Sequence, residues 1–139
     1  MVHLPTLTRW FIKSAMLYLM AALLLSIALQ PPLRQELPFL AAMWPTYLHL
    51  LVLGWLTQLI FGVALWLFPK YSPSRPRGDE RLSWASFLLL NLGLLLRAVA
   101  EPSHALGYPV GALLIVAALA QLLAGWAFVL NTWPRVRER

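Results

Sequence analysis

The sequence contains no cysteine and little charge. The absence of cysteine among 139 residues excludes disulfides, thiolate metal sites, iron–sulfur clusters and a cysteine nucleophile. Charged residues make up 12% of the chain, whereas soluble domains carry roughly a quarter. The sequence also lacks a Ser-His-Asp set, a carboxylate pair, a glycine-rich phosphate loop and a zinc motif. We therefore do not expect a stand-alone enzyme.

The sequence contains long apolar segments. The chain is 60% hydrophobic, and four of its stretches approach or exceed the roughly 20 residues needed to cross about 30 Å of hydrocarbon. A lone strand cannot satisfy its backbone in lipid, so each stretch is expected to be a helix. The predicted fold class is all-α: one domain over residues 1–139, an integral membrane four-helix bundle surrounded by the lipid bilayer. The expected helices cover about 10–29, 45–68, 82–100 and 109–132, followed by a basic tail at 134–139.

Prolines mark the ends of these stretches. Pro69 ends the second, and the segment Glu101-Pro102-Ser103-His104 is expected to break the third, because proline cannot continue the hydrogen-bond ladder. Between Lys70 and Arg81, prolines and charges predict a solvated loop in which Asp79 and Glu80 form surface ion pairs. Ser26-Ile27-Ala28 resembles a signal cleavage site. The first apolar run is long for a signal core, however, and predicts an uncleaved anchor.

The distribution of Lys and Arg predicts the orientation. With four crossings, the N-terminus, the middle loop and the C-terminus share one side of the membrane. That side holds Arg9, Lys13, Lys70, Arg75, Arg77, Arg81, Arg135, Arg137 and Arg139. The other side holds Arg34 and, at a helix end, Arg97. By the positive-inside rule, both termini are expected to be cytoplasmic in the cytoplasmic (inner) membrane of a bacterium. The formal charge of +6 is then a topology signal and a contact for anionic lipid rather than for nucleic acid.

His49 is the first candidate for chemistry. It lies about one turn inside the second expected helix, and an ionisable group at membrane depth is costly unless it is paired. A neutral imidazole is also a common ligand of haem iron. The alternative is a packing or interfacial histidine that bonds to a neighbour.

The sequence around His49 resembles a known helix. Tyr47-Leu48-His49-Leu50-Leu51-Val52-Leu53-Gly54-Trp55-Leu56-Thr57-Gln58, running on to Gly62 and Leu67-Phe68-Pro69, is similar to the second helix of the catalytic subunit of haem–copper oxidases and nitric oxide reductases. The resemblance covers mainly one helix of four. It implies that His49 is an axial ligand of haem b. The full set of copper-ligating histidines is missing, since only His3, His49 and His104 are present. Oxygen reduction is therefore not expected.

Arg97 and His104 are the other candidates for a haem site. Arg97 lies in the same leaflet as His49 and could bind haem propionates through a bidentate contact. Its alternatives are snorkelling to the interface or pairing with Glu101, four residues later on the same helix face. His104 lies in the expected outer loop. It could supply a second axial ligand or simply be solvated.

Amides and small residues predict how the helices pack. Gln58, Asn91 and Gln121 each fall about halfway along a helix and could form one hydrogen-bonded layer. Gly54, Gln58 and Gly62 lie four apart, a spacing that lets a neighbouring helix approach closely. Ala120, Ala124 and Ala127, with Gly125, suggest the same for the last helix.

Two functions remain open at this point. The first is a membrane b-type haem protein for electron transfer, gas binding or haem handling. The second is a cofactor-free accessory or structural subunit of a larger respiratory membrane complex. A small multidrug transporter would need a carboxylate in its first helix, and none lies between Trp10 and Leu29.

We also expect a homodimer. At 100° per residue, His49 and Gln58 fall on opposite sides of the second helix. If Gln58 faces the interior, His49 turns outwards and needs a partner chain to cover it. Two His49 side chains could then share one haem across the dimer axis.

Overall fold

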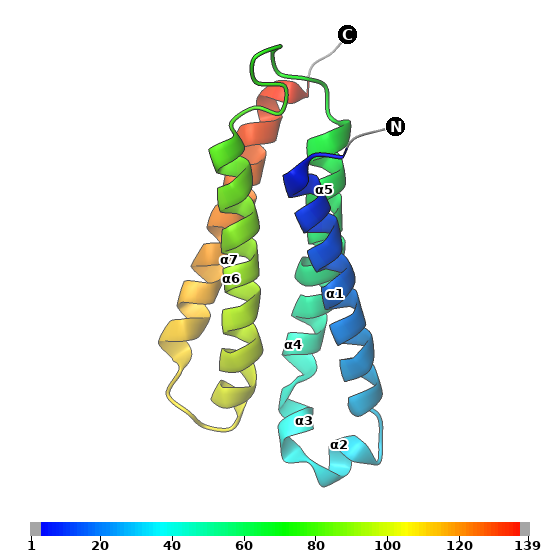
Figure 1. Ribbon diagram of the computed structural model, residues 1–139. Coiled ribbons are helices and arrows are strands. Elements are labelled where there is room, and N and C mark those ends of the chain that lie inside the picture. Colours follow the sequence, from blue (N-terminus) through cyan, green and yellow to red (C-terminus); the bar gives the residue numbers. More distant parts are fainter. Residues whose placement is uncertain (1–3, 137–139) are drawn as a thin grey trace.

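The computed structural model describes residues 4–136, which form two pairs of long antiparallel helices (Figure 1). In the first pair, α1 (Thr6–Ala28) packs along a continuous helix made of α4 (Trp44–His49), η1 (Leu50–Thr57) and α5 (Gln58–Leu67). In the second, α6 (Glu80–Ala105) packs along α7 (Gly111–Thr132). The connections contain α2 (Leu33–Glu36) and α3 (Pro38–Ala42), and a 3₁₀ turn, η2 (Trp133–Arg135), follows α7.

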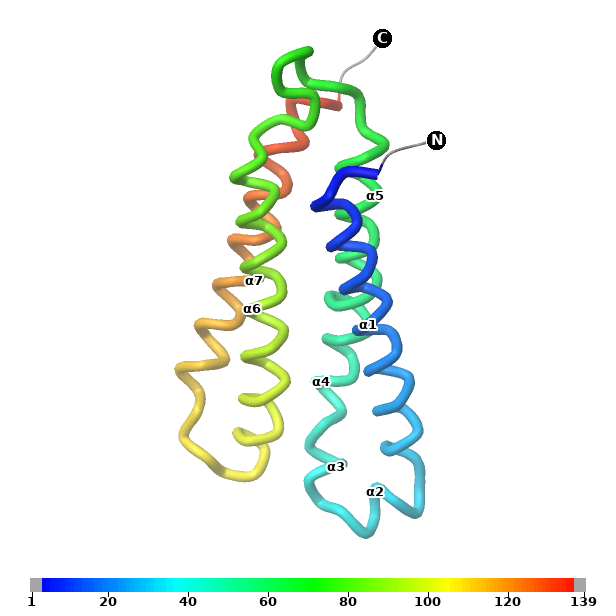
Figure 2. The backbone as a smooth tube through the Cα atoms, in the orientation of Figure 1, coloured from blue at the N-terminus to red at the C-terminus, as the bar shows by residue number. Residues whose placement is uncertain are grey.

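The backbone has two distinct ends (Figure 2). We name the terminal end after the first and last described helices, because the start of α1 and the end of η2 lie there together with the loop at 68–79. The distal end carries α2, α3 and the turn at 106–110. An even number of crossings places both termini at one end, in agreement with the sequence-based topology.

All four long helices are long and apolar enough to cross a membrane. Large apolar side chains stand on the outside of the bundle, among them Leu17 at 71% and Leu67 at 63% exposed. In water such a surface would be unfavourable, whereas lipid tails cover it without cost. The chain is therefore a multi-pass membrane protein.

The observed helix bounds differ from the expected ones chiefly at the third helix. The prediction that Glu101-Pro102-Ser103-His104 breaks this helix is wrong, because α6 passes through Pro102 and ends only at Ala105. A proline in the last turns of a helix removes a single ladder bond, and packing against neighbouring helices compensates for it. Pro102 is itself buried. This extension places Glu101 inside the helix rather than in a loop.

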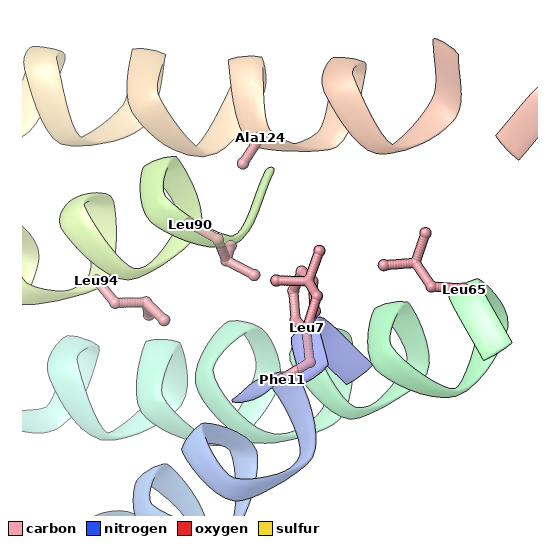
Figure 3. Packing of buried hydrophobic residues seen from close by; sticks show 6 residues of the cluster. All are labelled: Leu7, Phe11, Leu65, Leu90, Leu94 and Ala124. Carbon is pink, nitrogen blue, oxygen red and sulfur yellow. The ribbon is translucent and has the colours of Figure 1, made fainter. Parts of the chain in front are cut away.

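An apolar core fills the half of the bundle near the terminal end (Figure 3). It contains Leu7, Phe11, Leu65, Leu90, Leu94 and Ala124, contributed by α1, α5, α6 and α7. The Phe11 ring meets the Phe87 ring edge-on with centroids 5.1 Å apart, and Phe61 stacks on Phe128 at 3.8 Å. Aromatic contacts of this kind add stability beyond the area they bury.

Small residues bring the paired helices close together, as predicted. A Cβ atom added at Gly54 would lie 2.8 Å from the Tyr18 side chain, and one at Gly62 would lie 2.7 Å from that of Phe11. Both partners belong to α1, which confirms the expected close approach. On α7, Ala120, Ala124 and Ala127 are buried, whereas a Cβ at Gly125 would meet open space. Gly125 is therefore not part of the packing stripe.

Arg135 closes the terminal end. Its side chain is 2% exposed and donates to three carbonyl oxygens at the end of α5: Pro69 at 3.0 Å, Leu65 at 3.1 Å and Phe68 at 2.8 Å. The last carbonyls of a helix lack hydrogen-bond partners and carry partial negative charge. Arg135 supplies both the missing N–H donors and a positive charge. Sequence analysis treated Arg135 only as a topology signal.

Asn131 joins the end of α7 to the loop before α6. Its Oδ1 accepts from the backbone N–H of Asp79 at 2.7 Å, and its Nδ2 donates to Ser83 Oγ at 2.6 Å. Gly78 has φ of 77° and lies so close to Asn131 that a Cβ there would collide with it. The predicted surface ion pair of Asp79 is replaced by a helix cap, because its Oδ1 accepts from the N–H of Arg81 at 2.8 Å.

Candidate functional site

A carboxylate inside the helical bundle gathers three donors near the distal end. Glu101 of α6 is 9% exposed. Its Oε2 accepts from Thr46 Oγ1 at 3.0 Å, and its Oε1 accepts from Arg97 Nη1 at 3.0 Å and lies 2.9 Å from His49 Nδ1. We name Thr46, His49, Arg97, Glu101 and Gln121 the distal cluster. It joins α4 to α6 and, through Gln121, to α7.

The surroundings of His49 determine which ring nitrogen carries the proton. Nδ1 lies 2.9 Å from the Pro45 carbonyl oxygen and 2.9 Å from Glu101 Oε1. Both neighbours only accept, so we assign the proton to Nδ1. In the neutral imidazole the lone pair then lies on Nε2, which has no hydrogen-bond partner among residues 4–136. The side chain is 31% exposed, so the ring is reachable from outside the bundle.

Arg97 balances the charge of Glu101. Its Nη1 binds the carboxylate and its Nε donates to Gln121 Oε1 at 2.9 Å. This pairing with Glu101 is one of the alternatives that the sequence left open. If His49 is neutral, the guanidinium and the carboxylate cancel and the net charge of the distal cluster is close to zero. A paired arginine at membrane depth is far less costly than an isolated one. The Nη2 group keeps its donors for a further acceptor.

The placement of His49 corrects the geometric premise of the expected dimer. His49 does not point away from the bundle, because its Nδ1 contacts Glu101 of the same chain. Gln58 does face the interior and is 0% exposed. Both can do so because Leu50–Thr57 is π-helical, with bonds to the fifth rather than the fourth preceding residue. The wider turn makes each residue advance by less than 100°, so nine positions no longer separate opposite faces.

No other histidine in residues 4–136 joins this cluster. His104 is exposed near the end of α6, and no contact joins it to His49 in the described part of the chain. His3 lies outside the described residues. Within residues 4–136 no three His, Asp or Glu side chains gather into a group that could hold a bare metal ion. A metal ion at His49 would therefore need further ligands from a prosthetic group, as the iron of haem has.

A second polar group lies deeper in the bundle. Tyr18 donates to Asn91 Oδ1 at 2.8 Å, and Asn91 Nδ2 donates to Gln58 Oε1 at 2.8 Å. The predicted amide layer is confirmed for Gln58 and Asn91. Gln121 instead binds Arg97. These bonds link α1, α5 and α6, and they serve packing rather than chemistry.

From the sequence, Glu101 is expected only as a possible partner of Arg97, at a point where Pro102 breaks the helix. Its contacts with His49 and Thr46 are not expected. Two local signals were available: Glu101 lies four residues after Arg97, and Thr46 lies one turn before His49. Neither signal shows that the two helices meet at this depth, which depends on tertiary packing.

Comparison with known proteins gives no relative. No protein-family model, no curated protein and no solved structure matches this chain. The features that bear on function are therefore the distal cluster and the sequence around His49.

Proposed function

We propose that the protein binds b-type haem through His49 Nε2, for electron transfer, gas binding or haem handling in the membrane. The observation that carries this proposal is the paired acceptor environment of Nδ1, made by Glu101 Oε1 and the Pro45 carbonyl, both at 2.9 Å. Histidines that bind metals commonly donate their other N–H to a carboxylate or a carbonyl, which fixes the ring and raises the basicity of the ligating nitrogen. The π-helical turn directly after His49 also fits, since such turns often occur at functional sites.

Glu101 and Arg97 of the distal cluster then have defined tasks. Glu101 holds the Nδ1 proton of His49 and so keeps the Nε2 lone pair available. Arg97 neutralises Glu101, and its remaining Nη2 donors could reach a propionate at the membrane surface. Bound haem would supply an iron that changes oxidation state or takes a small ligand. Because the His49 ring is partly exposed, a bound haem would lie on the outside of the helix pair rather than within the bundle core.

The second axial ligand defines two arrangements. In a homodimer, two His49 side chains would ligate one haem from both faces. In the other arrangement His104 serves the haem of its own chain. The dimer no longer rests on an outward-facing His49. It rests on Nε2, which is unpartnered and carried by a ring that is 31% exposed. Half a haem per chain would support the shared site, whereas one haem per chain that disappears in His104→Ala would refute it.

A visible absorption spectrum tests the haem proposal. Protein purified from cells supplied with haem should show a Soret band that His49→Ala abolishes or shifts strongly. Arg97→Ala should weaken haem retention with a smaller spectral change, because arginine does not touch the iron. His3→Ala removes a histidine that the proposal does not use, so it is the matched control and should leave the spectrum unchanged. A colourless wild-type preparation would refute the proposal.

A cofactor-free accessory subunit is the second candidate, and one observation favours it. Glu101 already has three partners and Arg97 two, so the distal cluster can hold α4, α6 and α7 together without any cofactor. The same spectrum separates the two candidates, because this one predicts no Soret band.

The proposed orientation has both termini in the cytoplasm of a bacterial cell. It is supported by the nine Lys and Arg residues assigned to that side against two on the other. A phosphatase reporter fused after Arg139 should be inactive, and the same reporter in the turn at 106–110 should be active. The reverse pattern would contradict this orientation.

A further inference from the structure

A large open pocket lies at the terminal end, far from the distal cluster. Its volume is about 870 Å³, and its walls come from the start of α1, the loop before α6 and the start of α6. Four arginines line it, and we name it the basic pocket after them: Arg9, Arg75, Arg77 and Arg81. Sequence analysis placed these residues on one side of the membrane but did not bring them together.

The arginines of the basic pocket form no ion pair with the described part of the chain. None of the four forms an ion pair with a carboxylate in residues 4–136. Asp79 and Glu80 also line the pocket, but the Asp79 side chain is engaged by the N–H of Arg81 as a helix cap. With four arginines against two carboxylates in the lining, positive charge is in excess, and a bound anion would relieve the remaining repulsion.

Two helix N-termini open into the same space. α1 begins at Thr6 with no side-chain cap and no acidic residue in its first turn, so its first N–H groups lack partners. α6 also begins in the pocket wall, at Glu80, but its first turn is already capped by the Asp79 carboxylate, so the free N–H groups are those of α1. The positive ends of helix dipoles favour anions, and phosphate groups often bind there.

A buried hydroxyl in the wall also lacks a partner. Thr8 lines the basic pocket and is 1% exposed, and its Oγ1 has no hydrogen-bond partner in the described part of the chain. Arg135 Nη1, at the same end of the bundle, is also buried and has no partner in residues 4–136. Buried polar atoms of this kind are normally satisfied, so each one calls for an explanation.

We infer that the basic pocket binds a phosphate-bearing anion, either the headgroup of an anionic phospholipid or a soluble phosphate compound. The pocket volume exceeds that of inorganic phosphate and leaves room for a headgroup. Its position at the ends of two membrane-spanning helices places it at headgroup level. Basic pockets between membrane helices are typical binding sites for such headgroups. This site is independent of haem binding at His49.

Native mass spectrometry of the full chain in neutral detergent tests the inference. The probes are phosphatidylglycerol, phosphatidylcholine and inorganic phosphate, each added separately. The wild-type protein should retain phosphatidylglycerol in preference to phosphatidylcholine. The double variant Arg75→Gln/Arg81→Gln should bind it roughly thirtyfold more weakly, at about 1 kcal/mol per basic residue near the surface. Arg34→Gln/Lys70→Gln removes the same charge outside the pocket and should leave retention unchanged.

The outcomes separate the two sources of phosphate. Retention of phosphatidylglycerol alone identifies a lipid headgroup, and competition by millimolar inorganic phosphate identifies a soluble ligand. Equal retention of the two lipids without an effect of phosphate overturns the inference, as does an equal loss in both double variants. Thr8→Val keeps the shape of the pocket wall and removes only the hydroxyl group. It provides a second test of the site if the arginine variants do not fold. It should bind phosphatidylglycerol several-fold more weakly, and unchanged binding there would also count against the site.

Discussion

The two ends of the bundle use polar groups in different ways. In the distal cluster, the buried charge of Glu101 is met by Arg97 and by the N–H of His49. At the terminal end, the buried charge of Arg135 is met by three backbone carbonyls, and the pocket arginines are met by no carboxylate in residues 4–136. The contrast follows from depth. Inside the hydrocarbon a charge needs a counter-charge, whereas at a helix end backbone dipoles, water and headgroups can serve.

This comparison predicts the largest loss of stability at Glu101. Glu101→Ala leaves Arg97 as an uncompensated cation and removes the partner of His49, which should lower the free energy of unfolding by about 3 kcal/mol. Thermal unfolding in detergent measures this loss. Glu36→Ala, at an exposed carboxylate in α2, is the control and should change little. Glu101→Gln keeps an acceptor oxygen and should fall between the two. A loss in Glu101→Ala no larger than in the control would mean that the distal cluster does not hold the helices together.

A smaller effect is expected at Arg135. Arg135→Ala removes three hydrogen bonds to the end of α5, but water can replace some of them there, so we expect a loss of about 2 kcal/mol. Amide hydrogen exchange should increase around Leu65 and the loop at 68–79 and stay unchanged at the distal end. Arg135→Lys should restore only part of the lost stability, because an ammonium group lacks the planar guanidinium that donates to several carbonyls at once. Full rescue by lysine would show that charge alone matters at this position.

The smallest effect is expected between the two ends, at the neutral pair Gln58 and Asn91. A double-mutant cycle with Gln58→Leu and Asn91→Leu should give a coupling energy of about 0.6 kcal/mol, the average for hydrogen bonds between membrane helices. Gln58 Nε2 is itself buried without a partner, so Gln58→Leu alone should cost little. A coupling energy as large as the Glu101 effect would contradict the distinction between charged and neutral polar groups.

Local patterns in the sequence were sufficient for the membrane architecture. Hydropathy and length predict the four long helices, because crossing hydrocarbon requires a continuous apolar helix whatever its neighbours are. The spacing of Gly54, Gln58 and Gly62 likewise predicts that a neighbouring helix packs closely, and the structure shows that this helix is α1. The even number of crossings places the two termini together. These features depend on residues near each other in the chain, which is why the sequence alone determines them.

Tertiary structure decided which polar side chains meet. The π-helical turn at Leu50–Thr57 lets His49 and Gln58 both face inwards, and nothing in that apolar run signals a departure from 100° per residue. The passage of α6 through Pro102 places Glu101 against His49 rather than in a loop. Arg135 reaches carbonyls nearly seventy positions earlier in the chain. In each case, the partner of a buried polar group is chosen by helix register and helix pairing, and both are set by the packing of the whole bundle.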